Sequence, residues 1–404
     1  MKSQLLSSAA LLASGVFGAR EWLNEPDTGI ELSLPDLKPG ELASIDSVVG
    51  LPDFEYVARN YLPIKNYTYY RNGAGGEWAY RHNVEVFQQY AIRSRTMIDI
   101  TNIEASLPTQ ILGHNFSVPF YITPFSRADL AHEGAETNLV KAAAAQNILY
   151  VPSHYAYQSI ETIGAAKAEG QVLFQQVCES IFLSYRTFIY QMLQLYLTSN
   201  DTRTQIELDR AKAAGHKAIV FTVDCPAPAN RHRAARFDVL SLNQAYVPLT
   251  WEFYKKLTTM TDLPIILKGI QTVEDAKLAL ENGVPGIILS NHGGRQLDTA
   301  RGPLHIALEI HRKAPELFQK LEILADGGVR YGADALKLLA LGVKAVGIGR
   351  PFAFANIYGQ EGVERAIKIL RREIAIDAAN AGVADLKKIK PDVIDWDTPY
   401  GYSG

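Results

Sequence analysis

The chain of 404 residues has few cysteines, no long apolar run beyond its N-terminus and no large excess of charge. Its two cysteines, Cys178 and Cys225, are too few for a disulfide framework, and their spacing does not indicate a metal site. A net charge of −3 gives no basic surface, which argues against a nucleic-acid partner. Since no run of roughly eighteen apolar residues follows the N-terminus, the sequence predicts no membrane span.

The N-terminus itself resembles a secretory signal peptide. A lysine precedes a stretch of apolar and small residues, and Gly18-Ala19 would be the cleavage site, so residues 1–19 would be removed. An ordinary N-terminal helix is the alternative. Three glycosylation sequons would be usable in a secretory route, although such triplets also arise by chance. We therefore predict a secreted protein or one of the secretory pathway; the sequons begin at Asn66, Asn115 and Asn200.

Apolar runs alternate with Ala- and Glu-rich segments over most of the remaining chain. Segments such as 133–146 and 272–283 have the apolar spacing of amphipathic helices. Hydrophobic residues make up 47% of the chain, which suffices for one large core. Eight β-α units favour an α/β fold of the (β/α)8 TIM-barrel type over an open doubly wound sheet. The strands are predicted at 119–123, 147–151, 171–175, 217–224, 264–269, 286–291, 322–328 and 344–349.

The predicted barrel spans residues 116–385. Residues 20–115 precede it and contain an aromatic, Gly-rich segment, 67–78, which we expect to cover one end of the barrel. A C-terminal tail is predicted at 386–404.

The segment SNHGGRQLD, residues 290–298, is the most informative motif. Its two glycines would form a sharp turn after an apolar strand, so that His292 and Arg295 project from the end of that strand. Imidazole accepts a proton near neutral pH, and guanidinium forms a planar fork for a carboxylate. The pair suits a small acidic substrate that must lose a proton. A polar loop with a solvated arginine is the alternative.

Other polar residues also follow the predicted strands. The carboxyl ends of the strands form the catalytic face of a barrel, so these residues should gather there. Glycines and arginines in 326–330 and 347–351 indicate a phosphate site after the last two strands, where barrels commonly bind phosphate. A Gly-rich turn with a solvated arginine is again the alternative. The strand-end residues include Thr222, Asp224, Lys268, Ser290, Asp326, Arg330, Gly349 and Arg350.

Together these motifs resemble the FMN-dependent 2-hydroxy acid oxidase/dehydrogenase family, which includes glycolate oxidase, lactate oxidase and the flavin domain of yeast L-lactate dehydrogenase. The resemblance runs from about Tyr56 to Val383 and is most specific at 290–298. It implies a secreted member of fungal type that binds FMN, oxidises a small (S)-2-hydroxy acid to the 2-oxo acid and passes the electrons to O2, giving H2O2. A dehydrogenase or monooxygenase of the family and a flavin-binding pseudo-enzyme are the alternatives. Whether the chain forms a homo-oligomer stays open.

The resemblance also implies roles for individual residues. His292 would take a proton from the substrate, Asp224 would stabilise the imidazolium and raise its basicity, and Tyr196 would be a further catalytic residue. Arg295 and Tyr69 would hold the substrate carboxylate. The substrate pocket would also contain Arg231, as a positive charge at its mouth, and Tyr155.

The implied FMN contacts come from most of the strand ends. Lys268 would face the N1 edge of the flavin, where negative charge develops on reduction. The full set is Pro124, Phe125, Ser126, Ser153, Gln176, Thr222, Lys268, Ser290, Asp326, Gly327, Gly328, Val329, Arg330, Gly349 and Arg350.

The chain departs from the family pattern at several points. Phe125 and Ser126 stand where two small residues are usual, Tyr155 replaces a pocket tryptophan, and the loop between Phe237 and Trp251 is short. These differences prevent transfer of a substrate preference.

The largest departure is an atypical insert at 177–194. Its removal would restore the continuous phrase FQQLYLTSND, which places the flavin-binding glutamine two residues before the catalytic tyrosine, as in the family. We hypothesise a retained intron; a genuine β-α loop insertion is the alternative. With the insert present, either Gln176 or Gln194 would face the flavin.

Overall fold

The computed structural model describes residues 28–178, 201–239 and 246–397. The predicted signal peptide, Tyr196, Gln194 and the sequon at Asn200 lie outside these residues, as does nearly all of the predicted insert. Within the described residues, no helix is both long and apolar enough to cross a membrane.

Parallel strands close into a barrel, which confirms the predicted fold. Seven strands form one sheet in the order β3-β9-β8-β7-β6-β5-β4. The remaining predicted strand, 147–151, lies between β3 and β4 and closes the barrel. It does so through single bridges from Tyr150 to Ile122 on one side and to Leu173 on the other. The strands are β3 Phe120–Ile122, β4 Phe174–Val177, β5 Ala218–Thr222, β6 Ile265–Ile270, β7 Gly286–Leu289, β8 Glu322–Asp326 and β9 Val346–Ile348.

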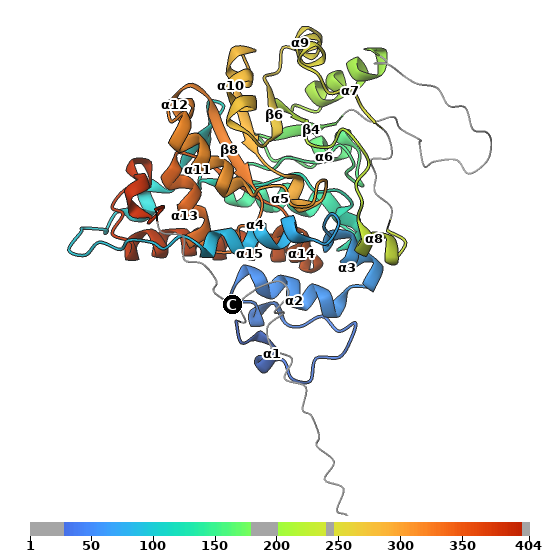
Figure 1. Ribbon diagram of the computed structural model, residues 1–404. Helices are drawn as coiled ribbons and strands as arrows, with labels where there is room; N and C mark the ends of the chain where they lie inside the picture. Colours follow the sequence, from blue (N-terminus) through green and yellow to red (C-terminus); the bar gives the residue numbers. More distant parts are fainter. Residues whose placement is uncertain (1–27, 179–200, 240–245, 398–404) are drawn as a thin grey trace, which may run out of the picture.

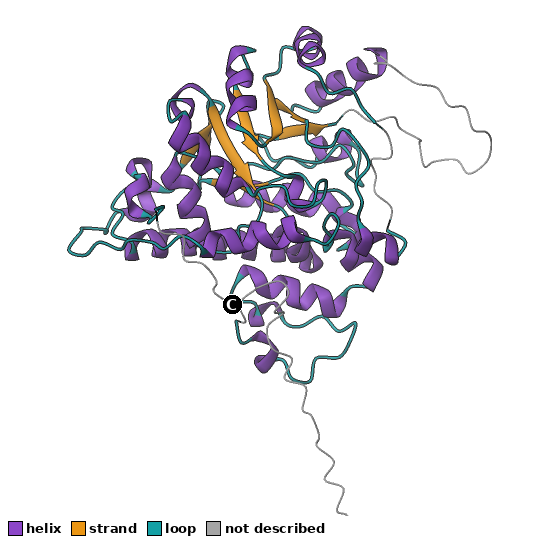
Figure 2. Cartoon of the chain, viewed as in Figure 1, coloured by secondary structure: helices purple, strands orange, loops and turns teal. Residues whose placement is uncertain are grey.

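Helices follow the strands and surround the barrel (Figures 1 and 2). Residues at the helix ends stabilise them. The Thr272 hydroxyl caps α10 by accepting from the Asp275 amide at 3.0 Å, and α13 is followed by Gly342, whose φ of 107° suits glycine. The helices around the barrel are α5 Ala135–Gln146, α6 Ile160–Ala165, α7 Asp201–Ala213, α8 His232–Arg236, α9 Trp251–Met260, α10 Val273–Glu281, α11 Pro303–Lys313, α12 Leu317–Lys320, α13 Gly332–Leu341, α14 Arg350–Ala355 and α15 Gly359–Asn380.

The core has two parts because strand side chains alternate between the inside and the outside of the barrel. Outward side chains pack against the helices in one large cluster. Inward side chains form a second cluster, which also contains Ile111 and Phe116 from the antiparallel pair β1 Thr109–Ile111 and β2 His114–Phe116. The inward residues include Tyr121, Leu149, Phe174, Val220, Ile266, Ile288 and Leu324.

The N-terminal segment reaches both ends of the barrel, and residues 67–78, which were predicted to cover one end, lie at the carboxyl ends of the strands. The β1–β2 pair packs into the interior cluster, and the helices before it lie at the opposite end, where the strands have their carboxyl ends (Figure 1). There the Asp298 carboxylate accepts hydrogen bonds from the backbone amides of Gly76 and Ala79, at 2.8 and 3.0 Å. These helices are α1 Ile30–Ser33, α2 Leu51–Tyr61, α3 Ile64–Tyr70 and α4 Trp78–Gln88.

The predicted C-terminal tail is, within the described residues, part of the packed structure. Ile394 forms an antiparallel bridge with Ile92, and Trp396 is buried against the core.

Candidate active site

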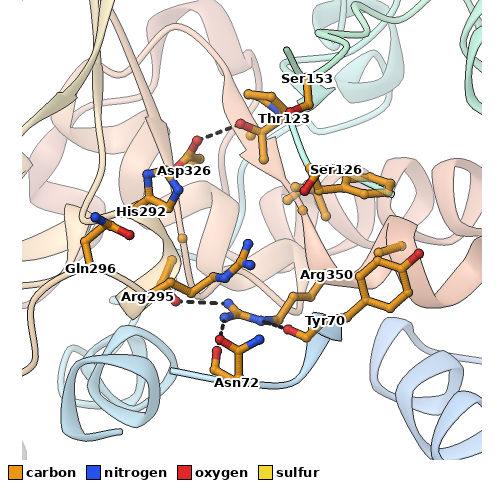
Figure 3. A pocket seen from close by; sticks show the side chains of 18 of the residues that line it. Tyr70, Asn72, Thr123, Ser126, Ser153, His292, Arg295, Gln296, Asp326 and Arg350 are labelled. Atoms are coloured by element: carbon orange, nitrogen blue, oxygen red, sulfur yellow. Dashed lines mark hydrogen bonds between the residues drawn. The ribbon is translucent and has the colours of Figure 1, made fainter. Parts of the chain in front are cut away.

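A cavity opens at the carboxyl ends of the strands, with an empty volume of about 1330 Å³ that includes open solvent. It gathers most of the predicted site residues (Figure 3). Asp224 and Ser290 do not line it but lie buried behind the wall. The predicted residues that line it are Tyr69, Pro124, Phe125, Ser126, Ser153, Tyr155, Gln176, Thr222, Arg231, Lys268, His292, Arg295, Asp326, Gly327, Gly328, Val329, Arg330, Gly349 and Arg350.

His292 stands at a strained turn directly after β7. The turn, η5 His292–Gly294, has three consecutive residues with positive φ, and His292 itself has φ 59°. Such a conformation is uncommon for a residue with a side chain, and it is held by the surroundings. The His292 amide donates to Ser290 Oγ at 3.0 Å, and Asn291 Oδ1 accepts from the Gly294 amide at 3.0 Å. The turn thereby directs the imidazole into the cavity.

The imidazole of His292 is paired with Asp224. Its Nδ1 lies 2.7 Å from Asp224 Oδ1, and the Asp224 side chain is fully buried. This contact assigns the Nδ1 proton to the Asp224 side, because a carboxylate needs a donor there. Nε2 is then the atom that can accept a proton.

Burial lowers the pKa of His292 below its ordinary value, even though the Asp224 carboxylate acts to raise it. We expected from the sequence that Asp224 would make His292 a stronger base. The carboxylate does act in that direction, but the effect of burial on the pKa is larger. Burial also acts to raise the pKa of Asp224, but the charges of His292 and Lys268 outweigh it and the pKa is lowered. At neutral pH the pair consists of a neutral imidazole and a carboxylate.

Two guanidinium groups, those of Arg231 and Arg295, line the same cavity as the imidazole. Arg231 Nε donates to the Arg295 carbonyl at 2.8 Å, and Arg231 Nη2 donates to Gln296 Oε1 at 2.6 Å. Arg295 Nε is buried and has no hydrogen-bond partner among the described residues. Burial, and then the charge of Arg231, lower the pKa of Arg295 to about 9. An anion placed here would remove both the repulsion and the missing hydrogen bond.

Tyr69 reaches the same part of the cavity from α3. Its hydroxyl lies 2.6 Å from Ser126 Oγ, one of the two positions where the chain departs from the family pattern. Phe125, the other, packs edge-on against Tyr70 with ring centroids 6.3 Å apart. The Phe125 ring is thus packed against Tyr70, a contact that the sequence motifs did not reveal.

A buried network surrounds Lys268. Lys268 Nζ donates to Ser290 Oγ at 3.0 Å and lies 3.4 Å from Asp326 Oδ2. Ser290 Oγ in turn donates to Asp326 Oδ1 at 2.6 Å. Burial acts to lower the pKa of Lys268, but the carboxylates of Asp326 and Asp224 outweigh it, so the pKa is raised and the group stays charged. Ser290 thus holds the network from behind the cavity wall.

Thr123 was missed from the sequence. Its hydroxyl donates to Asp326 Oδ2 at 2.6 Å, across the β3–β9–β8 side of the barrel (Figure 3). Its place at the end of a predicted strand, next to Pro124, was a usable signal.

Gln176 links three strand ends. Its Oε1 accepts from the His154 amide at 2.8 Å and from Ser153 Oγ at 3.2 Å, while its Nε2 donates to Thr222 Oγ1 at 2.9 Å. Gln176 therefore lines the cavity with its amide fixed in orientation. Gln194, the alternative, lies outside the described residues.

The first residues of the predicted insert belong to the barrel. Val177 pairs with Phe221 as the last residue of β4, and Cys178 lines the cavity. Cys178 stands two residues after Gln176, which is the position Tyr196 would take without the insert. The Cys178 Sγ lies 3.9 Å from the Tyr155 hydroxyl.

The turn predicted to bind phosphate, residues 326–330, lies in close contact with the backbone of helix α4. Gly327 and Gly328 have φ of 125° and 87°, and a Cβ on Gly328 would come within 1.8 Å of the Asn83 carbonyl oxygen. The Arg330 amide is fixed by Asp334 Oδ2 at 2.9 Å. Only glycine allows helix α4 to approach this turn so closely.

Arg350 has a structural role that its predicted phosphate role did not anticipate. It donates from Nε to the Tyr70 carbonyl at 2.9 Å, from Nη1 to the Gly293 carbonyl at 3.0 Å and from Nη2 to the Asn72 carbonyl at 2.8 Å. Figure 3 shows this fork between the N-terminal segment and the His292 turn. Burial lowers the pKa of Arg350 to about 10, so it stays a cation at the cavity wall.

The arrangement fits FMN. Lys268 offers a buried cation at one side of the cavity, as an anionic reduced flavin requires. The other side offers the bare backbone of Gly327, Gly328 and Gly349 beside Arg330 and Arg350, which suits a phosphate. These features are those expected of a flavin-binding barrel, with the His292 imidazole beside the cavity.

The chain belongs to the FMN-dependent dehydrogenase family, whose sequence pattern it matches over residues 58–247 and 239–396. It is 33% identical over 408 aligned residues to the L-lactate dehydrogenase (cytochrome) of Saccharomyces cerevisiae, covering 91% of this chain and 66% of that protein. It is 33% identical to the glycolate oxidase of Spinacia oleracea, covering 87% of this chain and 97% of that protein. This chain therefore spans just under two thirds of the yeast enzyme but nearly all of the plant enzyme.

Solved structures agree with this assignment. The flavin-binding domain of baker's yeast flavocytochrome b2 superposes with a TM-score of 0.79 at 33% identity and covers 90% of each chain. Mandelate oxidase superposes with a TM-score of 0.74 at 30% identity, covering 86% of this chain and 98% of the other. The chain is accordingly a member of the family that contains flavocytochrome b2, glycolate oxidase and mandelate oxidase.

Proposed function

We propose that the protein oxidises a small (S)-2-hydroxy acid to the 2-oxo acid and transfers the electrons to O2, so that each turnover gives one H2O2. The observation that carries the proposal is the pairing of a base with an anion site: His292 Nε2 is an acceptor, and the neighbouring Arg295 Nε is buried without a partner among the described residues. A carboxylate bound at Arg295 would bring its 2-hydroxyl group next to the imidazole.

The residues divide the work as follows. Arg295 and Tyr69 bind the substrate carboxylate, and Arg231 adds positive charge while it fixes the Arg295 backbone. His292 Nε2 takes the hydroxyl proton, and the Asp224 carboxylate offsets the charge that then forms on the imidazole. FMN, when bound, would accept the hydrogen on C2 with its two electrons. Lys268, buried and charged, would offset the negative charge this leaves on the flavin.

The choice of O2 as acceptor rests on the oxidases among the relatives, such as the glycolate oxidase of Spinacia oleracea, which is 33% identical to this chain over 384 residues. The L-lactate dehydrogenase (cytochrome) of Saccharomyces cerevisiae shares 33% identity over 408 residues. A dehydrogenase of the same family is the second candidate, since that yeast enzyme is equally similar over the shared part.

Anaerobic mixing separates the two. The purified holoenzyme is mixed without oxygen with glycolate, L-lactate or L-mandelate, with D-lactate as the matched control, and bleaching of the flavin is followed. Bleaching by an L-acid or glycolate but not by D-lactate is expected. Air is then admitted: rapid reoxidation with one H2O2 per acid supports the oxidase, while slow reoxidation that cytochrome c or a quinone accelerates supports the dehydrogenase. No bleaching by any acid would contradict both.

We also propose that the protein enters the secretory pathway, on the basis of residues 1–19. Of the two sequons within the described residues, the one at Asn115 is exposed. At Asn66 the side-chain nitrogen donates to the Leu130 carbonyl at 2.9 Å, so a glycan there would break that contact. Glycosidase treatment of secreted protein should therefore report a glycan at Asn115 and none at Asn66.

A further inference from the structure

The Asp224–His292 pair lies in a wall between two cavities. The cavity already described touches His292, Cys178 and Cys225. A second cavity, with an empty volume of about 1720 Å³ that includes open solvent, touches Asp224 from the other side. It is lined largely by apolar groups such as Val223, Pro226, Leu249, Trp251 and Leu267. The pair is therefore enclosed between the two cavities, with the Asp224 side chain fully buried.

Three chemically different donors meet in this wall. One ligand atom each of Asp224, Cys225 and His292 lies within 4.8 Å of the other two. Carboxylate oxygen, thiolate sulfur and imidazole nitrogen are the ligand types of Zn²⁺ sites. Bond lengths of about 2.0–2.3 Å to such an ion require donors about 3–4 Å apart, so a small side-chain rotation suffices.

An unsatisfied atom in the same wall points independently to a ligand. Asp224 Oδ1 is paired with His292, but Asp224 Oδ2 is buried and has no hydrogen-bond partner among the described residues. Leaving a carboxylate oxygen buried without a donor costs free energy, and a bound cation would remove that cost.

A further thiol, that of Cys178, lies next to one of these three donors, Cys225. The side chains of Cys178 and Cys225 interact, and this contact together with burial raises the pKa of the Cys225 thiol. Binding of a metal ion displaces the thiol proton, because the thiolate is the ligand form. Lys268 and Arg295 also face the site and oppose a cation, whereas Asp224 and a Cys225 thiolate supply two negative charges that offset it.

We propose that Asp224, Cys225 and His292, with Cys178 as a fourth donor, form a binding site for a thiophilic divalent cation of the Zn²⁺ type. The bound ion occupies the imidazole and the carboxylate and so holds the base of the active site out of use. Cys178, Cys225 and His292 all line the first cavity, so the ion enters the site from that side. Cation binding does not depend on the proposed reaction; only its inhibitory effect does.

Direct binding tests the site apart from any activity. The FMN-loaded protein is dialysed against Zn²⁺, and Cd²⁺ is titrated in parallel to follow the ultraviolet absorbance of cadmium–thiolate bonds. One ion per chain with a thiolate signal is expected. Cys225→Ser should weaken binding at least roughly 10-fold and remove most of the signal, and Cys178→Ser should have a smaller effect. FMN content measures whether each variant is folded, and Cys225→Ala replaces Cys225→Ser if the latter loses FMN.

The His82–His305 pair provides the matched control. These two imidazoles lie 3.1 Å apart, away from the cavity, and are the competing candidate for Zn²⁺. His82→Gln should leave binding unchanged. The proposal is overturned if His82→Gln abolishes binding, if Cys225→Ser binds as tightly as the parent protein, or if the parent binds no ion.

Turnover gives the functional test. Zn²⁺ should inhibit turnover of the parent protein with unchanged FMN content, a chelator should restore it, and Cys225→Ser should stay active in Zn²⁺ that inhibits the parent. Inhibition that is equal in the parent and in Cys225→Ser would contradict the proposed effect. A protein that binds the ion as predicted but oxidises no 2-hydroxy acid would leave the site standing and refute the proposed function.

Discussion

The cavity has a base end, formed by His292 and Arg295 with Asp224 buried behind the wall, and a phosphate end, formed by Gly327, Gly328, Arg330 and Arg350. The two ends differ in how their charged groups are hydrogen-bonded. At the base end, Asp224 Oδ2 and Arg295 Nε are buried without hydrogen-bond partners among the described residues. At the phosphate end, Arg350 donates from all three guanidinium nitrogens to backbone carbonyls. A buried polar atom without a partner costs roughly 1–3 kcal/mol. At the base end, a bound ligand must therefore supply the missing hydrogen bonds, whereas at the phosphate end the protein itself supplies them. Substitutions at the base end should impair catalysis, and substitutions at the phosphate end should impair FMN binding and stability.

The largest effect is expected for His292→Asn. Asparagine keeps hydrogen-bonding ability and similar size but cannot take the substrate proton, so anaerobic flavin reduction should slow by roughly 10²-fold or more. FMN content should be unchanged, since the residue acts at the base end. Reduction at the parent rate would remove His292 from the mechanism.

Gly328→Ala should break the phosphate end instead. The added Cβ would come within 1.8 Å of the Asn83 carbonyl, at a residue with φ 87°. The backbone strain alone costs about 1–3 kcal/mol, and the overlap adds to it, so FMN content and melting temperature should both fall. Gly283→Ala is the matched control because it has φ 71° and no atom within 4 Å of its Cβ. Equal losses in the two variants would show that conformation, not the contact with α4, matters.

Arg295→Lys tests the anion site at the base end. Lysine keeps the charge but loses the planar fork, so KM for the 2-hydroxy acid should rise roughly 10-fold while FMN content stays constant. Arg330→Lys, at the other end, should do the reverse and weaken FMN. An unchanged KM for every acid tested in Arg295→Lys would contradict the anion site.

Deleting residues 177–194 tests whether the segment that follows Gln176 in strand β4 is a retained intron or a genuine loop. The deletion places Leu195 and Tyr196 directly after Gln176, in the positions now held by Val177 and Cys178. If the insert is a retained intron, soluble yield, FMN content and turnover should all rise several-fold, and Tyr196→Phe in the shortened protein should then impair turnover alone. Parent protein that performs as well as the shortened one, or a mature transcript that encodes the segment and yields active enzyme, would identify a genuine loop.

The smallest effect is a shift in pH dependence. Burial lowers the pKa of His292, so the neutral base should persist on acidification to below the ordinary histidine pKa of about 6.5. The rate of flavin reduction should be level at higher pH and fall only below that value. The Asp224 carboxylate acts to raise this pKa, so Asp224→Asn should slow reduction and move the fall to still lower pH. A fall that moves to higher pH would contradict the assigned balance.

The parts of the site that were predictable share one property: each belongs to a short motif at the end of a strand. His292, Lys268 and Asp326 each follow an apolar run, so the barrel topology alone brings them to one face. Gln296 and the structural role of Arg350 were missed because their partners lie far away in the sequence, whereas Thr123 was missed although it ends a predicted strand next to Pro124. The reciprocal hydrogen bonds between the Asn83 and Asn291 side chains, both 2.8 Å, join residues 208 positions apart, and no local pattern announces them.

The sequence by itself determined the barrel, the ends of its strands and the residues that meet there, because alternating apolar runs and glycine turns act over a few neighbouring residues. Only the tertiary structure decided which buried polar groups have hydrogen-bond partners. Asp224 was predicted to strengthen the base, but burial of His292 in the packed structure outweighs the carboxylate and lowers the pKa. Burial and hydrogen-bond saturation are properties of the whole packed chain, and so the unpaired atoms that identify the ligand sites could be found only there.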